Sequence, residues 1–84
     1  MAPLIPHEVV LYCAPDCTWC TAAREFLEEK HVPFTVIDVY EHRDKWRAAR
    51  RLTGRSGLPI ILIGGEALVG FERDELAARL GIDP

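Results

Sequence analysis

The stretch LYCAPDCTWC, Leu11–Cys20, holds every cysteine of this 84-residue chain: Cys13, Cys17 and Cys20. It continues a run rich in β-branched residues, Glu8–Tyr12, which predicts a short strand. Apolar residues then recur at helical spacing, which predicts a helix over Thr18–His31. Cys17 therefore lies where the loop after a strand meets the start of a helix, and Cys20 lies one turn inside that helix.

The remainder of the chain continues this alternation and indicates one α/β domain, residues 1–84. We expect three more strands and two more helices: strands Phe34–Val39, Pro59–Ile63 and Glu66–Val69, and helices Arg43–Leu52 and Glu72–Leu80. The strand Phe34–Val39 is rich in β-branched residues, so we expect both of its faces to be buried. Gly64-Gly65 predicts a hairpin, and the order βαβαββα predicts two parallel strands followed by two antiparallel ones.

Composition excludes several classes of function. The net charge is −3, so a general nucleic-acid binder is not expected. The start of the chain has no basic segment typical of a signal peptide, and the longest apolar run, Leu58–Ile63, is far shorter than the roughly 20 residues of a membrane helix. We therefore expect a cytoplasmic protein without a membrane partner, where clustered cysteines indicate redox or metal chemistry.

Basic residues are unevenly distributed. Six of the ten lysines and arginines fall between Arg43 and Arg55. This pattern is consistent with a solvated helix face or with a docking patch for an acidic partner.

The spacing Cys17-x-x-Cys20 predicts a dithiol that alternates between thiols and a disulfide. Backbone N–H groups and the positive end of the helix dipole favour the thiolate at Cys17, while Cys20 is close enough to resolve a mixed disulfide. Asp16 is expected either to cap the helix with its carboxylate or, as a neighbouring negative charge, to disfavour the thiolate of Cys17. Trp19 is expected to face solvent, where it packs on the loop or contacts the incoming disulfide.

Two alternatives use the cysteines as ligands. The spacing C-x3-C-x2-C resembles the cluster motif of radical SAM enzymes, whose barrel of about six βα units is too long for this chain. Zinc could bind the cysteines with His7, His31 or His42, and an iron–sulfur cluster could bridge two chains through Cys17. Cys13 is expected to pack as a small apolar residue or to act as a regulatory thiol that pairs with Cys17 or receives glutathione.

Three segments together resemble the glutaredoxin family: CTWC at 17–20, TGRSGLP at 53–59 and IGGEALVGFERDEL at 63–76. The resemblance runs from about Glu8 to Leu80. It implies a thioredoxin fold, in which a four-stranded mixed sheet is flanked by three helices. It also implies that Pro59 follows a cis peptide bond opposite the dithiol, and that the backbone of Leu58 binds an extended substrate peptide.

The resemblance further implies a dithiol thiol-disulfide oxidoreductase, a monomer that needs no bound cofactor and reduces protein or glutathione mixed disulfides. Ala14 stands where glutathione-dependent members usually carry lysine, and Gly70-Phe71 looks like the NrdH-redoxins, the electron donors of ribonucleotide reductase. Thioredoxin reductase is then the expected electron source. Glutathione is the alternative, with Arg55 available for its glycine carboxylate.

Overall fold

The computed structural model describes residues 8–54 and 57–84 and shows seven elements in the expected order. They are β1 (Val9–Cys13), α1 (Thr18–Glu29), β2 (Thr35–Asp38), α2 (Arg43–Thr53), β3 (Ile60–Ile63), β4 (Glu66–Val69) and α3 (Arg73–Leu80). Within the described residues, no helix is both long enough and apolar enough to cross a membrane.

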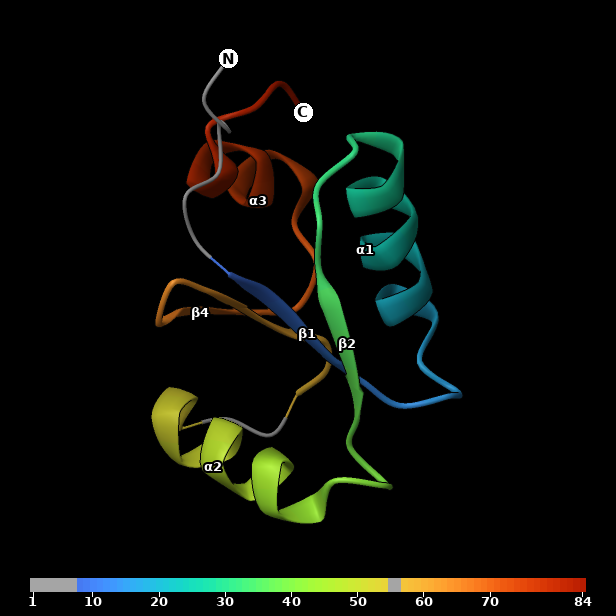
Figure 1. Ribbon diagram of the computed structural model, residues 1–84, viewed down its shortest axis with the longest axis vertical. Coiled ribbons are helices and arrows are strands. Elements are labelled where there is room, and N and C mark those ends of the chain that lie inside the picture. The colour runs from blue at the N-terminus through green and yellow to red at the C-terminus, as the bar shows by residue number, and fades with distance from the viewer. Residues whose placement is uncertain (1–7, 55–56) are drawn as a thin grey trace.

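The four strands form one mixed sheet with the order β2-β1-β3-β4 (Figure 1). β1 runs parallel to β2, with Leu11 opposite Val36 and Cys13 opposite Asp38. β1 is antiparallel to β3, and β3 is antiparallel to β4 across the turn at Gly64-Gly65. The sheet and its three helices match the thioredoxin fold that the sequence predicted.

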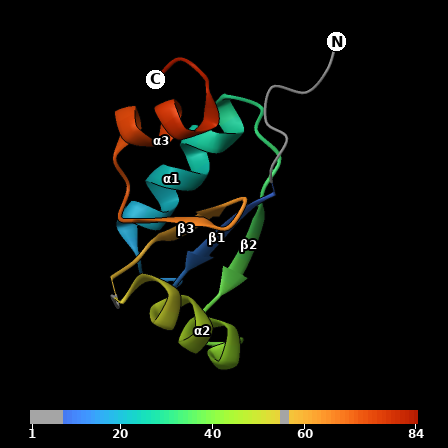
Figure 2. The same ribbon diagram turned by 90° about the vertical axis from the view of Figure 1, so that its left-hand side faces the viewer.

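Helices cover both faces of the sheet, and the alternation of side chains along β1 divides the core between them (Figure 2). Val9, Leu11 and Cys13 point to the face that carries α1 and α3, where they join Leu27 and Leu76. Tyr12 points to the other face, where it joins a smaller core with the α2 residue Ala49. Cys13 and Tyr12 therefore face opposite layers although they are neighbours in sequence.

The prediction that β2 is buried on both faces is wrong. Thr35 and Val36 are exposed, and Ile37 and Asp38 are only half-buried. The reason is the strand order, which places β2 at the edge of the sheet. A β-branched composition indicates a strand but does not distinguish a central position from an edge.

The first helix ends two residues earlier than predicted. The backbone of His31 adopts φ of +58°, which the helix cannot continue through. The N–H of Val32 then donates to the carbonyl of Leu27 at 2.9 Å, which closes the end of α1. α2 ends at Thr53, one residue beyond the predicted end, and Gly54 follows it in the left-handed conformation with φ of +69°.

Candidate active site

Cys17 is the N-cap of α1, with an extended backbone (φ −95°, ψ 110°). Its sulfur accepts a hydrogen bond from the backbone N–H of Cys20 at 3.3 Å. The prediction that Asp16 caps the helix is therefore wrong by one residue, because the sulfur of Cys17 accepts the N–H that a carboxylate oxygen of Asp16 was expected to accept. The first turn of α1 contains no acidic residue, so the dipole at this end acts on the sulfur without a carboxylate inside the turn.

Cys20 is buried, with 3 % of its surface exposed, and it faces the sheet. Its thiol lies 3.9 Å from the carbonyl oxygen of Tyr12, to which it donates. Burial raises the pKa of Cys20 well above its ordinary value, and hydrogen bonds with Cys17 and Cys13 raise it further. The pair is thus asymmetric: a half-buried sulfur caps the helix, while a protected neutral thiol lies behind it.

The peptide bond between Leu58 and Pro59 is cis, as predicted. Pro59 is fully buried, and its carbonyl accepts a hydrogen bond from the N–H of Gly70 at 2.7 Å. Leu58 is half-buried and packs against both cores, as Cys17 does. The structure therefore brings Leu58 and Cys17 to the boundary between the two layers.

The remaining predicted substrate-binding residues have different surroundings. Trp19 is 62 % exposed, so its indole is available to a partner. Gly70 has φ of +86°, a conformation that favours glycine, and open space surrounds the position of a Cβ. Phe71 is half-buried against Phe26 with ring centroids 5.8 Å apart, so it packs on α1. Arg55 lies outside the described residues.

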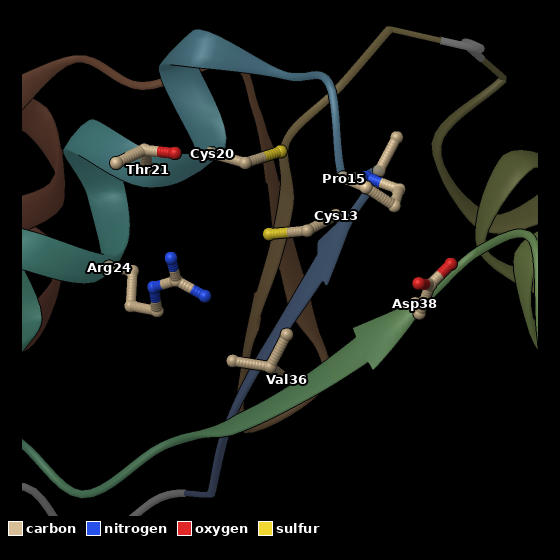
Figure 3. Close-up of a pocket in the computed structure, with 8 residues that line it drawn as sticks. Cys13, Pro15, Cys20, Thr21, Arg24, Val36 and Asp38 are labelled. Atoms are coloured by element: carbon tan, nitrogen blue, oxygen red, sulfur yellow. The ribbon is translucent and has the colours of Figure 1, made fainter.

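A pocket beside the dithiol was not predicted from the sequence (Figure 3). It has a volume of about 180 Å³, and it lies between α1 and the β1–β2 edge of the sheet. Its lining is Cys13, Ala14, Pro15, Cys20, Thr21, Arg24, Val36 and Asp38. Two patterns could have indicated it: the i, i+4 spacing of Cys20 and Arg24, and the parallel pairing that sets Asp38 beside Cys13.

The basic segment forms an exposed face of α2 on the opposite side of the sheet. Arg43, Arg47 and Arg50 line a shallow pocket of about 240 Å³ with Tyr40 and Trp46. The guanidinium of Arg50 lies over the Trp46 ring, 5.4 Å from its centroid. This geometry agrees with either expected role of the segment, a solvated helix face or a docking patch.

The zinc alternative requires ligands that are grouped within one chain. Among residues 8–54 and 57–84, no three histidine, cysteine, aspartate or glutamate side chains are grouped so that they could hold a metal ion. His31 and His42 are exposed, and His7 lies outside the described residues.

Comparisons with known proteins agree with this geometry. The family model described as Glutaredoxin matches residues 9–68. A relative from Clostridium pasteurianum, an uncharacterised glutaredoxin-like 8.6 kDa protein in the rubredoxin operon, is 32 % identical over 68 residues, covering 81 % of this chain and 91 % of the relative.

Solved structures of glutaredoxin-like proteins also resemble this chain. The glutaredoxin-like NrdH-redoxin from Escherichia coli matches with a TM-score of 0.77 and 27 % identity, covering 92 % of this chain and 99 % of that one. The glutaredoxin from Methanosarcina mazei Go1 matches with a TM-score of 0.82 and 25 % identity, over 98 % and 85 % of the two chains. Sequence, fold and the position of the dithiol all lead to one conclusion: this chain belongs to the glutaredoxin family.

Proposed function

We propose that the protein is a dithiol thiol-disulfide oxidoreductase that reduces disulfides of other proteins, or mixed disulfides with glutathione, through Cys17 and Cys20. The observation that carries the proposal is the asymmetry of the pair. The sulfur of Cys17 caps α1 and accepts the N–H of Cys20, whereas the thiol of Cys20 is buried and has a raised pKa. Such an arrangement separates a nucleophile from a resolving thiol.

In the first step, the thiolate of Cys17 attacks one sulfur of the substrate disulfide. A bond forms between that sulfur and Cys17, the substrate S–S bond breaks, and the departing thiolate takes a proton from solvent. Hydrogen bonding and the helix dipole stabilise the negative charge on Cys17 before the attack.

In the second step, Cys20 loses its proton and attacks the sulfur of Cys17. The mixed disulfide breaks, the second substrate thiol leaves, and a Cys17–Cys20 disulfide remains. The hydrogen bond from the backbone N–H of Cys20 to the sulfur of Cys17 at 3.3 Å keeps the two residues close together. Because the pKa of Cys20 is raised, this thiol is protonated in the reduced protein.

The oxidised protein then needs two electrons. We propose thioredoxin reductase as their source, in a cytoplasmic setting, with ribonucleotide reductase as one disulfide-bearing target. Support comes from Gly70-Phe71, from Ala14, and from similarity to an NrdH-redoxin whose activity profile is described as thioredoxin-like. The alternative reductant is glutathione, and NADPH oxidation coupled through thioredoxin reductase or through glutathione and its reductase distinguishes the two.

Two substitutions test the assignment of roles. Cys17→Ser is expected to abolish reduction of insulin, because the nucleophile is lost. Cys20→Ser is expected to accumulate a mixed disulfide with the substrate, visible as a mass increase that dithiothreitol reverses.

Glu25→Gln, an exposed change on the same helix, is the control and should keep wild-type activity. Thermal unfolding of each variant verifies that it is folded. Full insulin reduction by a folded Cys17→Ser protein would show that the proposed nucleophile is wrong.

A further inference from the structure

The three cysteines form a connected group in which Cys20 occupies the middle position. β1 directs the side chain of Cys13 towards α1, and the first turn of α1 carries the side chain of Cys20 (Figure 3). Cys13 and Cys20 belong to the same buried cluster and line the same pocket, and the backbone N–H of Cys20 donates to the sulfur of Cys17 at 3.3 Å. The expectation that Cys13 packs as a small apolar residue is confirmed by its burial, and the structure adds that Cys20 lines the same pocket.

The pocket beside the dithiol gives these sulfurs room to move. Both sulfur atoms, of Cys13 and of Cys20, are directed into the space between α1 and the edge of the sheet (Figure 3). A disulfide requires the sulfurs to approach to about 2.05 Å with a dihedral angle near 90°. Rotation of the two side chains into a pocket of about 180 Å³ can supply this approach without displacing packed core residues.

Charges on both sides of the pocket control the reactivity of Cys13. Burial raises the pKa of Cys13, and the negative charges of Cys17 and Asp38 raise it further. The hydrogen bond from Cys20 and the positive charge of Arg24 lower it. Arg24 comes from α1 and Asp38 from β2, so charges of opposite sign border the pocket.

We propose that Cys13 is a second disulfide partner of Cys20, so that the oxidised protein exists in two isomers. The step rests on the proposed function, which supplies the Cys17–Cys20 disulfide. The thiolate of Cys13 attacks the sulfur of Cys20, a Cys13–Cys20 bond forms, the Cys17–Cys20 bond breaks, and Cys17 leaves as a thiolate. The proton lost by Cys13 passes to solvent, and no external oxidant or reductant is consumed.

The exchange changes what the oxidised protein can do. In the first isomer, the half-buried sulfur of Cys17 is tied up in a disulfide. In the second, the disulfide lies between two buried cysteines, and Cys17 is again a free thiol at the start of α1. The oxidised protein can then attack another disulfide through Cys17, with a low-molecular-weight disulfide as the simplest substrate.

The test uses a convenient property of the sequence. No lysine or arginine precedes Arg24, so trypsin releases one peptide, residues 1–24, that contains all three cysteines. The protein is oxidised with one equivalent of cystine, incubated between pH 6 and pH 9, and quenched with acid. The free thiol is blocked with N-ethylmaleimide, the disulfide is reduced and alkylated with iodoacetamide, and fragmentation of the peptide locates each label.

We expect N-ethylmaleimide on Cys13 at early times and on Cys17 later, with a rate that rises about tenfold per pH unit as Cys13 ionises. The proposal is overturned if the label stays on Cys13 at every pH, or if it appears on Cys20. Three labels on the oxidant-treated protein would overturn both this proposal and the proposed function, because no disulfide would have formed at all.

A second variant tests the new pair without Cys17. In Cys17→Ser, oxidation is expected to close a disulfide between Cys13 and Cys20, seen as the loss of two hydrogen atoms by mass spectrometry of the monomer. The matched control is the double variant Cys13→Ser/Cys17→Ser, which keeps only Cys20 and cannot close an internal bond. A folded Cys17→Ser monomer that never loses these hydrogens would refute the new pair and leave the proposed function standing.

Discussion

Burial of the Cys20 thiol predicts how stability depends on pH. The folded chain holds this thiol neutral, because burial raises its pKa above the ordinary value of 9.0. Above that pH, the unfolded chain loses the proton of Cys20 more readily than the folded chain does. Stability from this group is therefore complete at neutral pH and is lost as the pH rises, with a free-energy cost of about 1.4 kcal/mol at about pH 10.

Cys20→Ala isolates this effect. Urea unfolding is measured between pH 7 and pH 10 with a phosphine reductant that keeps all thiols reduced. The variant is expected to be less stable at neutral pH, because buried volume is lost, but its stability should fall less with pH. The difference in unfolding free energy between wild type and variant should shrink by about 1.4 kcal/mol at about pH 10.

The exposed neighbour Thr21 supplies the control, since Thr21→Ala should follow the wild-type pH profile in parallel. Titration of tyrosines and lysines affects all three proteins alike and cancels in the differences. A difference between wild type and Cys20→Ala that stays constant from pH 7 to pH 10 would refute the reasoning. It would mean that Cys20 ionises as easily in the folded chain as in the unfolded one.

Two further predictions concern packing and substrate contact. Leu27 is fully buried between α1 and the sheet, so Leu27→Ala should lower the free energy of unfolding by about 2–5 kcal/mol. The control is Leu52→Ala at a 57 % exposed position, which should change the free energy of unfolding by less than about 1 kcal/mol. Equal losses in urea unfolding would contradict this core. Trp19→Ala should raise KM for insulin but not for a small disulfide, with stability within about 0.5 kcal/mol of wild type; an unchanged KM for insulin would remove Trp19 from the substrate surface.

The order of elements could be predicted because each signal was local. Cys17 lies at a strand-to-helix junction that alternation and helical spacing reveal together, and Gly64-Gly65 specifies its hairpin directly. The expected exposure of Trp19 is confirmed, since 62 % of its surface is exposed. The cis bond before Pro59 was different, because no local pattern required it and only the family resemblance implied it.

The features that the sequence did not predict depend on contacts between distant segments. The exposure of β2 follows from the order of strands, which no single strand encodes. The pairing of Cys13 with Asp38, and the placement of Arg24 across from them, require the parallel register between β1 and β2. Sequence reasoning therefore found the dithiol and the burial of Cys13, but not the pocket that Cys13 and Cys20 share.

Cys17 and Leu58 both pack against the two cores on opposite faces of the sheet. Most side chains of a three-layer protein pack within one layer only, but these two have contacts in both. A change of packing in either layer therefore alters the direct contacts of the Cys17 side chain. The reactivity of the Cys17 thiol should therefore respond to local opening of the layer on either side of the sheet, before the whole chain unfolds.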